Sequence, residues 1–112
     1  MTVNEKIINV LESLNIPIKS DFYGGGEKEY ITFNFAGDEA EFADDEPISL
    51  TTSVQIHYFL PAKKNYLPIK KKIRKLLFIS GFTYPAVTVI VEDETRHIVF
   101  ECEIEDDDEL EE

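Results

Sequence analysis

The chain has 112 residues, 43% of them hydrophobic, and a formal net charge of −12. This length and composition predict one globular domain and exclude a wholly disordered chain. No apolar run approaches the roughly 20 residues that cross a bilayer, and the charged N-terminal sequence does not fit a signal peptide, so we expect an intracellular protein. Cys102 is the single cysteine, which excludes an internal disulfide and a CxxC site.

The charges are divided into blocks of one sign. Residues 1–46 have a net charge of −8, residues 47–91 have +7 and no acidic side chain, and residues 92–112 have −11. This division predicts a positive patch between two negative regions, which favours association with surfaces of complementary charge.

The N-terminal residues predict an amphipathic helix over 2–15. Thr2 and Glu5 have the spacing of a capping box, and Pro17 marks where the helix has stopped. Three glycines at 24–26 then interrupt regular structure and are interpreted as a flexible link.

Two strands are predicted in the next part of the chain, separated by an acidic loop. Hydrophobic and polar residues alternate over 27–37 and again over 48–61, as in strands with one wet face. Residues 37–47 are interpreted as a loop whose acidic side chains face a partner or solvent: Asp38, Glu39, Glu41, Asp44, Asp45 and Glu46. They lack the ligand spacing and central glycine of an EF-hand, so we expect no metal site there.

A second helix is predicted from Pro68 to the residues before Gly81. Its apolar positions recur at helical spacing, and Gly81 fits the position just after a helix. Five basic residues fall on the outward positions: Lys70, Lys71, Lys72, Arg74 and Lys75. Of three interpretations, a nucleic-acid patch disagrees with a sequence pI near 4.5, a merely solvated face stays open, and docking to an acidic protein surface is favoured.

The chain then predicts a hairpin, with strands over 86–92 and 97–105. The predicted fold is α+β, a four-stranded, mainly antiparallel sheet with two amphipathic helices on one face, in the order α-β-β-α-β-β. Residues 1–105 are expected to form one domain, and residues 106–112 an acidic, disordered tail.

The residues that could carry chemistry do not form a recognisable site. His57 and His97 are interpreted as ordinary surface or edge residues, and Cys102 shares the parity of a buried strand face. No catalytic, cofactor or metal site is predicted, and an enzyme is not expected. A perturbed pKa at Cys102 or His57 is the sign that would point to one.

Element order and hydrophobic placement over residues 3–105 resemble the small tail-completion, or tail-terminator, proteins of long-tailed bacteriophages and prophages. The similarity is carried by "EKIINVLESL", "YITFNF", "SVQIHYFL", "IRKLLFISGF" and the hairpin "VIVEDETRHIVFECEIE". It implies a structural protein that caps the tail tube, joins it to the head connector and acts as a ring, commonly six-fold. Such a protein is cytoplasmic during assembly and later lies at the head-tail junction of the virion.

The implied partners are further copies of the chain, the tail tube protein and the head connector protein, with no nucleic acid and no membrane. On this interpretation the basic helix faces acids of residues 38–46 or of the C-terminal segment on a neighbour. A different head-tail connector, a minor capsid protein and an acidic inhibitor or antitoxin-like binding protein remain alternatives.

Overall fold

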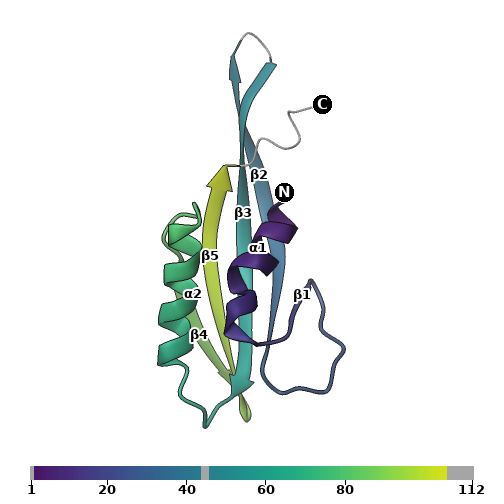
Figure 1. Cartoon of the computed structure of the whole chain (residues 1–112), viewed down its shortest axis with the longest axis vertical. Helices are drawn as coiled ribbons and strands as arrows, with labels where there is room; N and C mark the ends of the chain where they lie inside the picture. Colours follow the sequence, from purple (N-terminus) through teal and green to yellow (C-terminus); the bar gives the residue numbers. More distant parts are fainter. Residues whose placement is uncertain (1, 44–45, 106–112) are drawn as a thin grey trace.

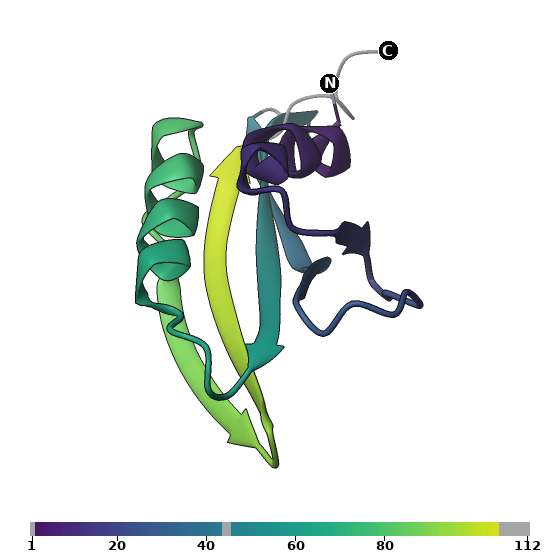
Figure 2. The same ribbon diagram turned by 60° about the horizontal axis from the view of Figure 1, so that its bottom comes forward.

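The computed structural model describes residues 2–43 and 46–105. Two α-helices, α1 (Val3–Leu11) and α2 (Leu67–Ile79), and a short 3-10 helix, η1 (Glu12–Leu14), accompany five strands. The strands are β1 (Ile18–Ser20), β2 (Tyr30–Ala43), β3 (Glu46–Pro61), β4 (Ala86–Glu92) and β5 (Thr95–Glu105). Figures 1 and 2 show both α-helices on the same side of the sheet.

The sheet has the strand order β1-β2-β3-β5-β4, and β1 runs parallel to β2 while the other pairs are antiparallel. The prediction of a four-stranded sheet was therefore wrong, because the sheet is five-stranded and mixed. The missed strand has three residues, too few to display an alternating pattern. Its pairing continues into the backbone on either side, where Ile31 N donates to Pro17 O and Asp21 N to Phe33 O, at 2.7 and 2.8 Å.

The acidic loop predicted at 37–47 was also wrong over most of its length. Gly37 to Ala43 belong to β2, and Glu46 and Pro47 belong to β3, whose backbones pair with each other. Antiparallel backbone pairing satisfies the peptide groups whatever the side chains are, so a run of acids can continue a hairpin. This hairpin extends past the other strands (Figure 1), and residues 44–45 lie outside the described residues.

Local signals fix the ends of the helices. Thr2 Oγ1 accepts a hydrogen bond from Glu5 N at 3.2 Å, which confirms the predicted N-cap of α1. At the C-terminal end of α2, Gly81 N donates to Phe78 O and Phe82 N donates to Leu77 O, which are the two bonds of a Schellman motif. Gly81 has φ 103°, a conformation that glycine adopts without steric cost.

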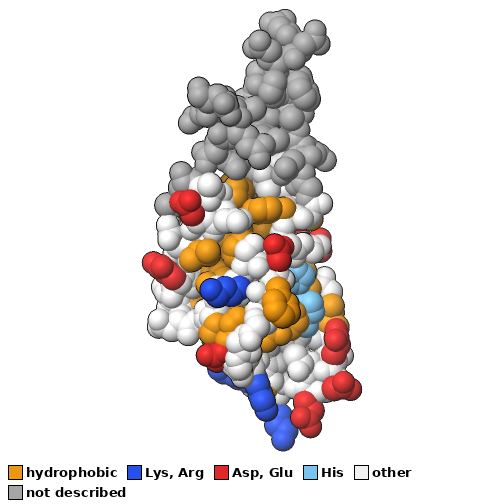
Figure 3. All heavy atoms as spheres, turned by 90° about the vertical axis from the view of Figure 1, so that its right-hand side faces the viewer, with side chains coloured by type: hydrophobic (Ala, Val, Ile, Leu, Met, Phe, Trp, Pro, Cys, Tyr) orange, Lys and Arg blue, Asp and Glu red, His pale blue; other side chains and the backbone are white. Residues whose placement is uncertain are grey.

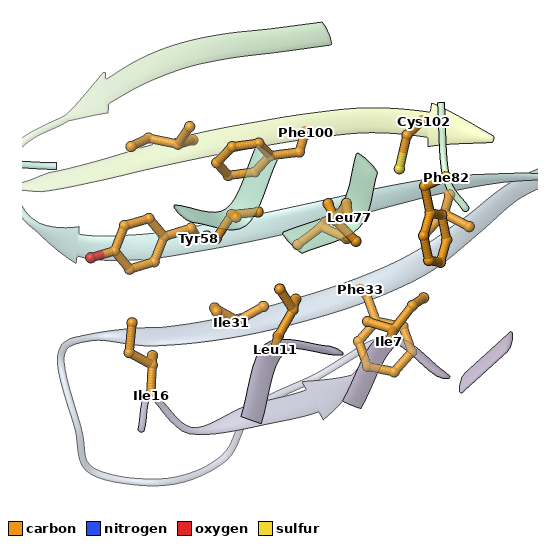
Figure 4. Packing of buried hydrophobic residues seen from close by; sticks show 14 of the residues in the cluster. Ile7, Leu11, Ile16, Ile31, Phe33, Tyr58, Leu77, Phe82, Phe100 and Cys102 are labelled. Carbon is orange, nitrogen blue, oxygen red and sulfur yellow. The ribbon is translucent and has the colours of Figure 1, made fainter. Parts of the chain in front are cut away.

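One hydrophobic core lies between the helices and the sheet. Ile7 and Leu11 of α1 and Leu77 of α2 point at Phe33 and Phe100 of the sheet (Figure 4). The buried positions of β3 and β5 alternate as predicted: Thr52, Val54, Ile56, Tyr58 and Leu60 on β3, and Ile98, Phe100, Cys102 and Ile104 on β5. Within the described part of the chain, no helix is long and apolar enough to span a membrane.

Candidate functional site

The basic residues of α2 line a surface groove of about 380 Å³. We define the basic groove by its lining residues: Leu67, Lys70, Lys71, Arg74, Lys75, Phe78 and Tyr84. Four of the five basic residues predicted from the sequence thus come together at one depression. Lys72 is exposed on the same helix and does not line it.

Arg74 differs from the lysines because its side chain bonds to the segment that follows the helix. Its Nε and Nη2 both donate to Pro85 O at 3.1 Å, and its guanidinium lies 4.7 Å from the centre of the Tyr84 ring. These contacts attach the segment between α2 and β4 to the middle of α2. Arg74 therefore shapes a wall of the groove, a structural contact that its outward position in the sequence did not predict.

The groove also has an apolar component that the charge pattern did not predict. Leu67, Phe78 and Tyr84 are 51%, 56% and 59% exposed, and the rings of Phe78 and Tyr84 meet edge to face with centroids 5.7 Å apart. Large apolar side chains this exposed beside several cations are typical of a surface that another protein covers.

Ion pairing within the described residues leaves the lysines of α2 available. A salt bridge joins Lys64 Nζ, after β3, to Glu29 Oε1, before β2, at 2.6 Å. None of Lys70, Lys71 and Lys75 pairs with an acid whose side chain the structure describes. This follows from the absence of acids in residues 47–91, which supply the whole helix and both its flanking loops. The groove can therefore bind an acidic surface without first breaking an ion pair to those residues.

The acids proposed as partners of this helix cannot be placed against it. Asp38, Glu39 and Glu41 lie on β2 and Glu46 on β3, but only their backbone positions are described. Asp44 and Asp45, and the predicted disordered segment 106–112, lie outside the described residues.

We call the sheet face opposite the helices the open face, and it holds a second cluster of side chains. Its polar part joins three strands: Asn34 on β2, Gln55 and His57 on β3, and His97 on β5. His57 Nδ1 lies 2.8 Å from His97 Nε2, and His57 Nε2 lies 2.7 Å from Asn34 Oδ1. Both histidines lie on the outward face of the sheet, as predicted, but they are half-buried and in contact with each other, which the sequence did not predict.

The hydrogen-bond directions follow from the amide. Asn34 Nδ2 donates to Gln55 Oε1 at 3.5 Å, so Asn34 Oδ1 accepts from His57 Nε2. When both rings are neutral, His57 Nδ1 then accepts from His97 Nε2. Burial lowers the pKa of His57, assisted by His97, and burial also lowers that of His97. The pair can take up one proton between its rings but not two without breaking this contact.

Stacked rings continue the open face along the sheet. Tyr23, Tyr30, Phe59 and His97 form a row with successive centroids 4.8, 4.8 and 4.1 Å apart. Gly25 passes so close to Tyr23 that a Cβ there would overlap the ring. Each inner ring uses both of its faces on its neighbours, so the row is not a platform for stacking nucleic-acid bases. Figure 3 shows histidine side chains at the surface beside hydrophobic ones.

The perturbed thiol of Cys102 does not have the character of a catalytic nucleophile. Cys102 is buried, as predicted, and burial raises the pKa of its thiol to about 12, the direction opposite to thiolate activation. His57 contacts Asn34 and His97, neither of which is a nucleophile. Among the residues described, no group of three or more His, Cys, Asp or Glu side chains could hold a metal ion.

Comparison with known proteins does not assign the chain. No protein-family model matches it, and no curated protein matches it significantly.

Proposed function

We propose that this chain is a non-enzymatic assembly protein that docks through its basic groove, in the role of a phage or prophage tail terminator. The observation that carries the proposal is the groove itself. Three lysines without a described acidic partner surround exposed aromatic and aliphatic side chains, on a molecule whose net charge is −12. A surface of this kind supports recognition of an acidic protein with apolar side chains.

The segregated charge supports assembly into a closed ring. A ring needs head-to-tail contacts, in which one patch of a subunit meets a different patch on the next. Residues 47–91 carry +7 and residues 92–112 carry −11, so every copy contains both a basic surface and acidic sequence that complements it. The further partners in this proposal are the tail tube protein and the head connector, with the protein passing from host cytoplasm to the head-tail junction.

The experiment is complementation of a gene deletion in the phage or prophage that encodes the chain. The deletion is expected to give over-long tails without heads in electron micrographs. A wild-type copy should restore normal particles, whereas the variant Lys70→Glu, Lys71→Glu, Lys75→Glu should not.

The matched control reverses three exposed lysines outside the groove, Lys19, Lys28 and Lys72, and changes the net charge by the same amount. Both variants should keep the circular dichroism spectrum of the wild type. Normal particles from the groove variant would contradict docking through the groove. Head-joined tails of normal length after the deletion would contradict the tail role.

A further inference from the structure

We infer that, in the free protein, the basic groove binds the acidic segment 106–112 of its own chain. The inference rests on the proposed function, because it names what a partner must displace from the same docking surface. It is based on where β5 ends, on the reach of the segment and on its composition.

The end of β5 lies at the same end of the molecule as the end of α2 (Figures 1 and 2). Thr83, in the segment after α2, is bonded directly to β5: its N donates to Glu103 O at 2.8 Å, and its Oγ1 accepts from Glu103 N at 2.9 Å. The next residue, Tyr84, lines the basic groove. Glu105, the last residue of β5, therefore lies at the end of the sheet next to one wall of the groove.

The segment is long enough to lie along the groove. Glu105 is two residues beyond Glu103, about 7 Å, and Tyr84 is one residue from Thr83, about 4 Å. With a strand spacing of about 5 Å, the path from Glu105 to Tyr84 is at most about 16 Å. Seven extended residues span about 23 to 25 Å. The segment can thus pass Tyr84 and continue beside the lysines.

The composition of the segment matches the groove in two respects. Residues 106–112 are six acids and one leucine, Leu110, and the groove offers lysines around exposed apolar side chains. Leu110 complements the exposed apolar side chains of Phe78 and Tyr84, and the acids complement the lysines.

Binding within one chain is favoured over binding to a second copy. Individual surface ion pairs are weak, about 0 to 1 kcal/mol each, so the segment binds weakly as a separate molecule. A short flexible connection gives an effective concentration on the order of 1 mM, far above the micromolar concentration of other copies. A segment with an intrinsic Kd of about 100 µM then occupies its own groove about nine-tenths of the time.

An external acidic partner must compete with this segment. With the same figures, the competition weakens binding of an outside ligand about tenfold. Only a partner that presents several acidic groups in a fixed arrangement binds well, which limits docking away from the assembling structure.

The test uses a fluorescein-labelled peptide with the sequence of residues 104–112 and measures fluorescence anisotropy at low salt. The full chain is compared with a chain that stops at Glu105. We expect the shortened chain to bind the peptide about tenfold more tightly. The groove reversals of Lys70, Lys71 and Lys75 in the shortened chain should abolish binding, and the reversals of Lys19, Lys28 and Lys72 should preserve most of it.

A Leu110→Ser peptide should bind the shortened chain several-fold more weakly. Equal affinity of the full and shortened chains would overturn the inference. So would peptide binding that survives the groove reversals. Light scattering separates the second-copy alternative: a full chain that self-associates, and loses this association on shortening, would overturn binding within one chain. Such results leave the complementation experiment unaffected, so failure here and failure of the proposed function are distinguishable.

Discussion

Arg74 is expected to stabilise the fold by about 2 to 3 kcal/mol, unlike the lysines beside it. Its guanidinium donates two hydrogen bonds to Pro85 O, both at 3.1 Å, and packs on Tyr84. Because both donors share one acceptor oxygen, we count them together as one hydrogen bond from a charged group, about 1.5 to 3 kcal/mol, and a cation over an exposed ring adds about 0.5 to 1 kcal/mol. Partial exposure of Arg74 places the total in the lower part of the summed range.

The measurement is urea unfolding of Arg74→Met followed by circular dichroism. Methionine retains the aliphatic packing and removes the donors and the charge. Arg74→Lys should recover part of the loss, because an ammonium group cannot reproduce the two-donor geometry. Lys72→Met, on the same helix but exposed and outside the groove, should stay within about 0.5 kcal/mol of the wild type. An Arg74→Met variant as stable as the Lys72→Met control would refute this role for Arg74.

Three further predictions concern stability. Tyr58→Phe keeps the buried ring but removes the hydrogen bond to the Glu29 carboxylate, so urea unfolding should show a loss of about 1 to 2 kcal/mol, and a neutral effect would contradict that bond. Burial lowers the folded pKa of His57 and His97 below the ordinary 6.5, so the unfolded chain binds more protons and stability should fall as pH decreases below about 6.5. Replacing both with Gln should flatten this slope below about pH 6.5, and an unchanged slope would assign it to other groups. Gly81→Ala should cost about 1 to 2 kcal/mol because of backbone strain at φ 103°, with no added clash, because the nearest atom outside the neighbouring residues is Lys6 Nζ, 3.8 Å from the added Cβ; a melting temperature equal to the wild type would argue against this strain.

Periodicity predicted the faces of the long elements well. Alternation over 48–61 and 97–105 identified the buried residues of β3 and β5, and the helical spacing of Ile73 and Leu77 identified the buried side of α2. These positions could be predicted because burial against a single core imposes one period on each element.

Three features could not be predicted because they depend on pairing between distant segments. β1 exists through three residues paired with Ile31 to Phe33, with no pattern of its own. The acidic end of β2 is held by backbone pairing to β3, which sequence charge does not reveal. His57 and His97 each had the correct outward parity, but their contact depends on the register that pairs His57 with Val99 and Phe59 with His97.

The basic groove was predictable only in part. Helical spacing placed the five basic residues outward, and their charge favoured docking. The pattern could not distinguish Lys72, which lies outside the groove, from Lys71, which lines it. The pattern also could not show that Tyr84 packs against α2, because that contact depends on the hydrogen bond from Arg74 to Pro85 O.

The most direct measurement of docking through the basic groove is site-specific photo-cross-linking during particle assembly. A benzophenone amino acid replaces Phe78, an exposed residue of the groove, or Ile90, an exposed residue of β4 away from it. We predict that the probe at position 78 links the chain to another copy or to a tail or connector protein, identified by mass spectrometry, and that the probe at position 90 does not. Cross-links from position 90 alone, in particles that assemble normally, would contradict docking through the basic groove.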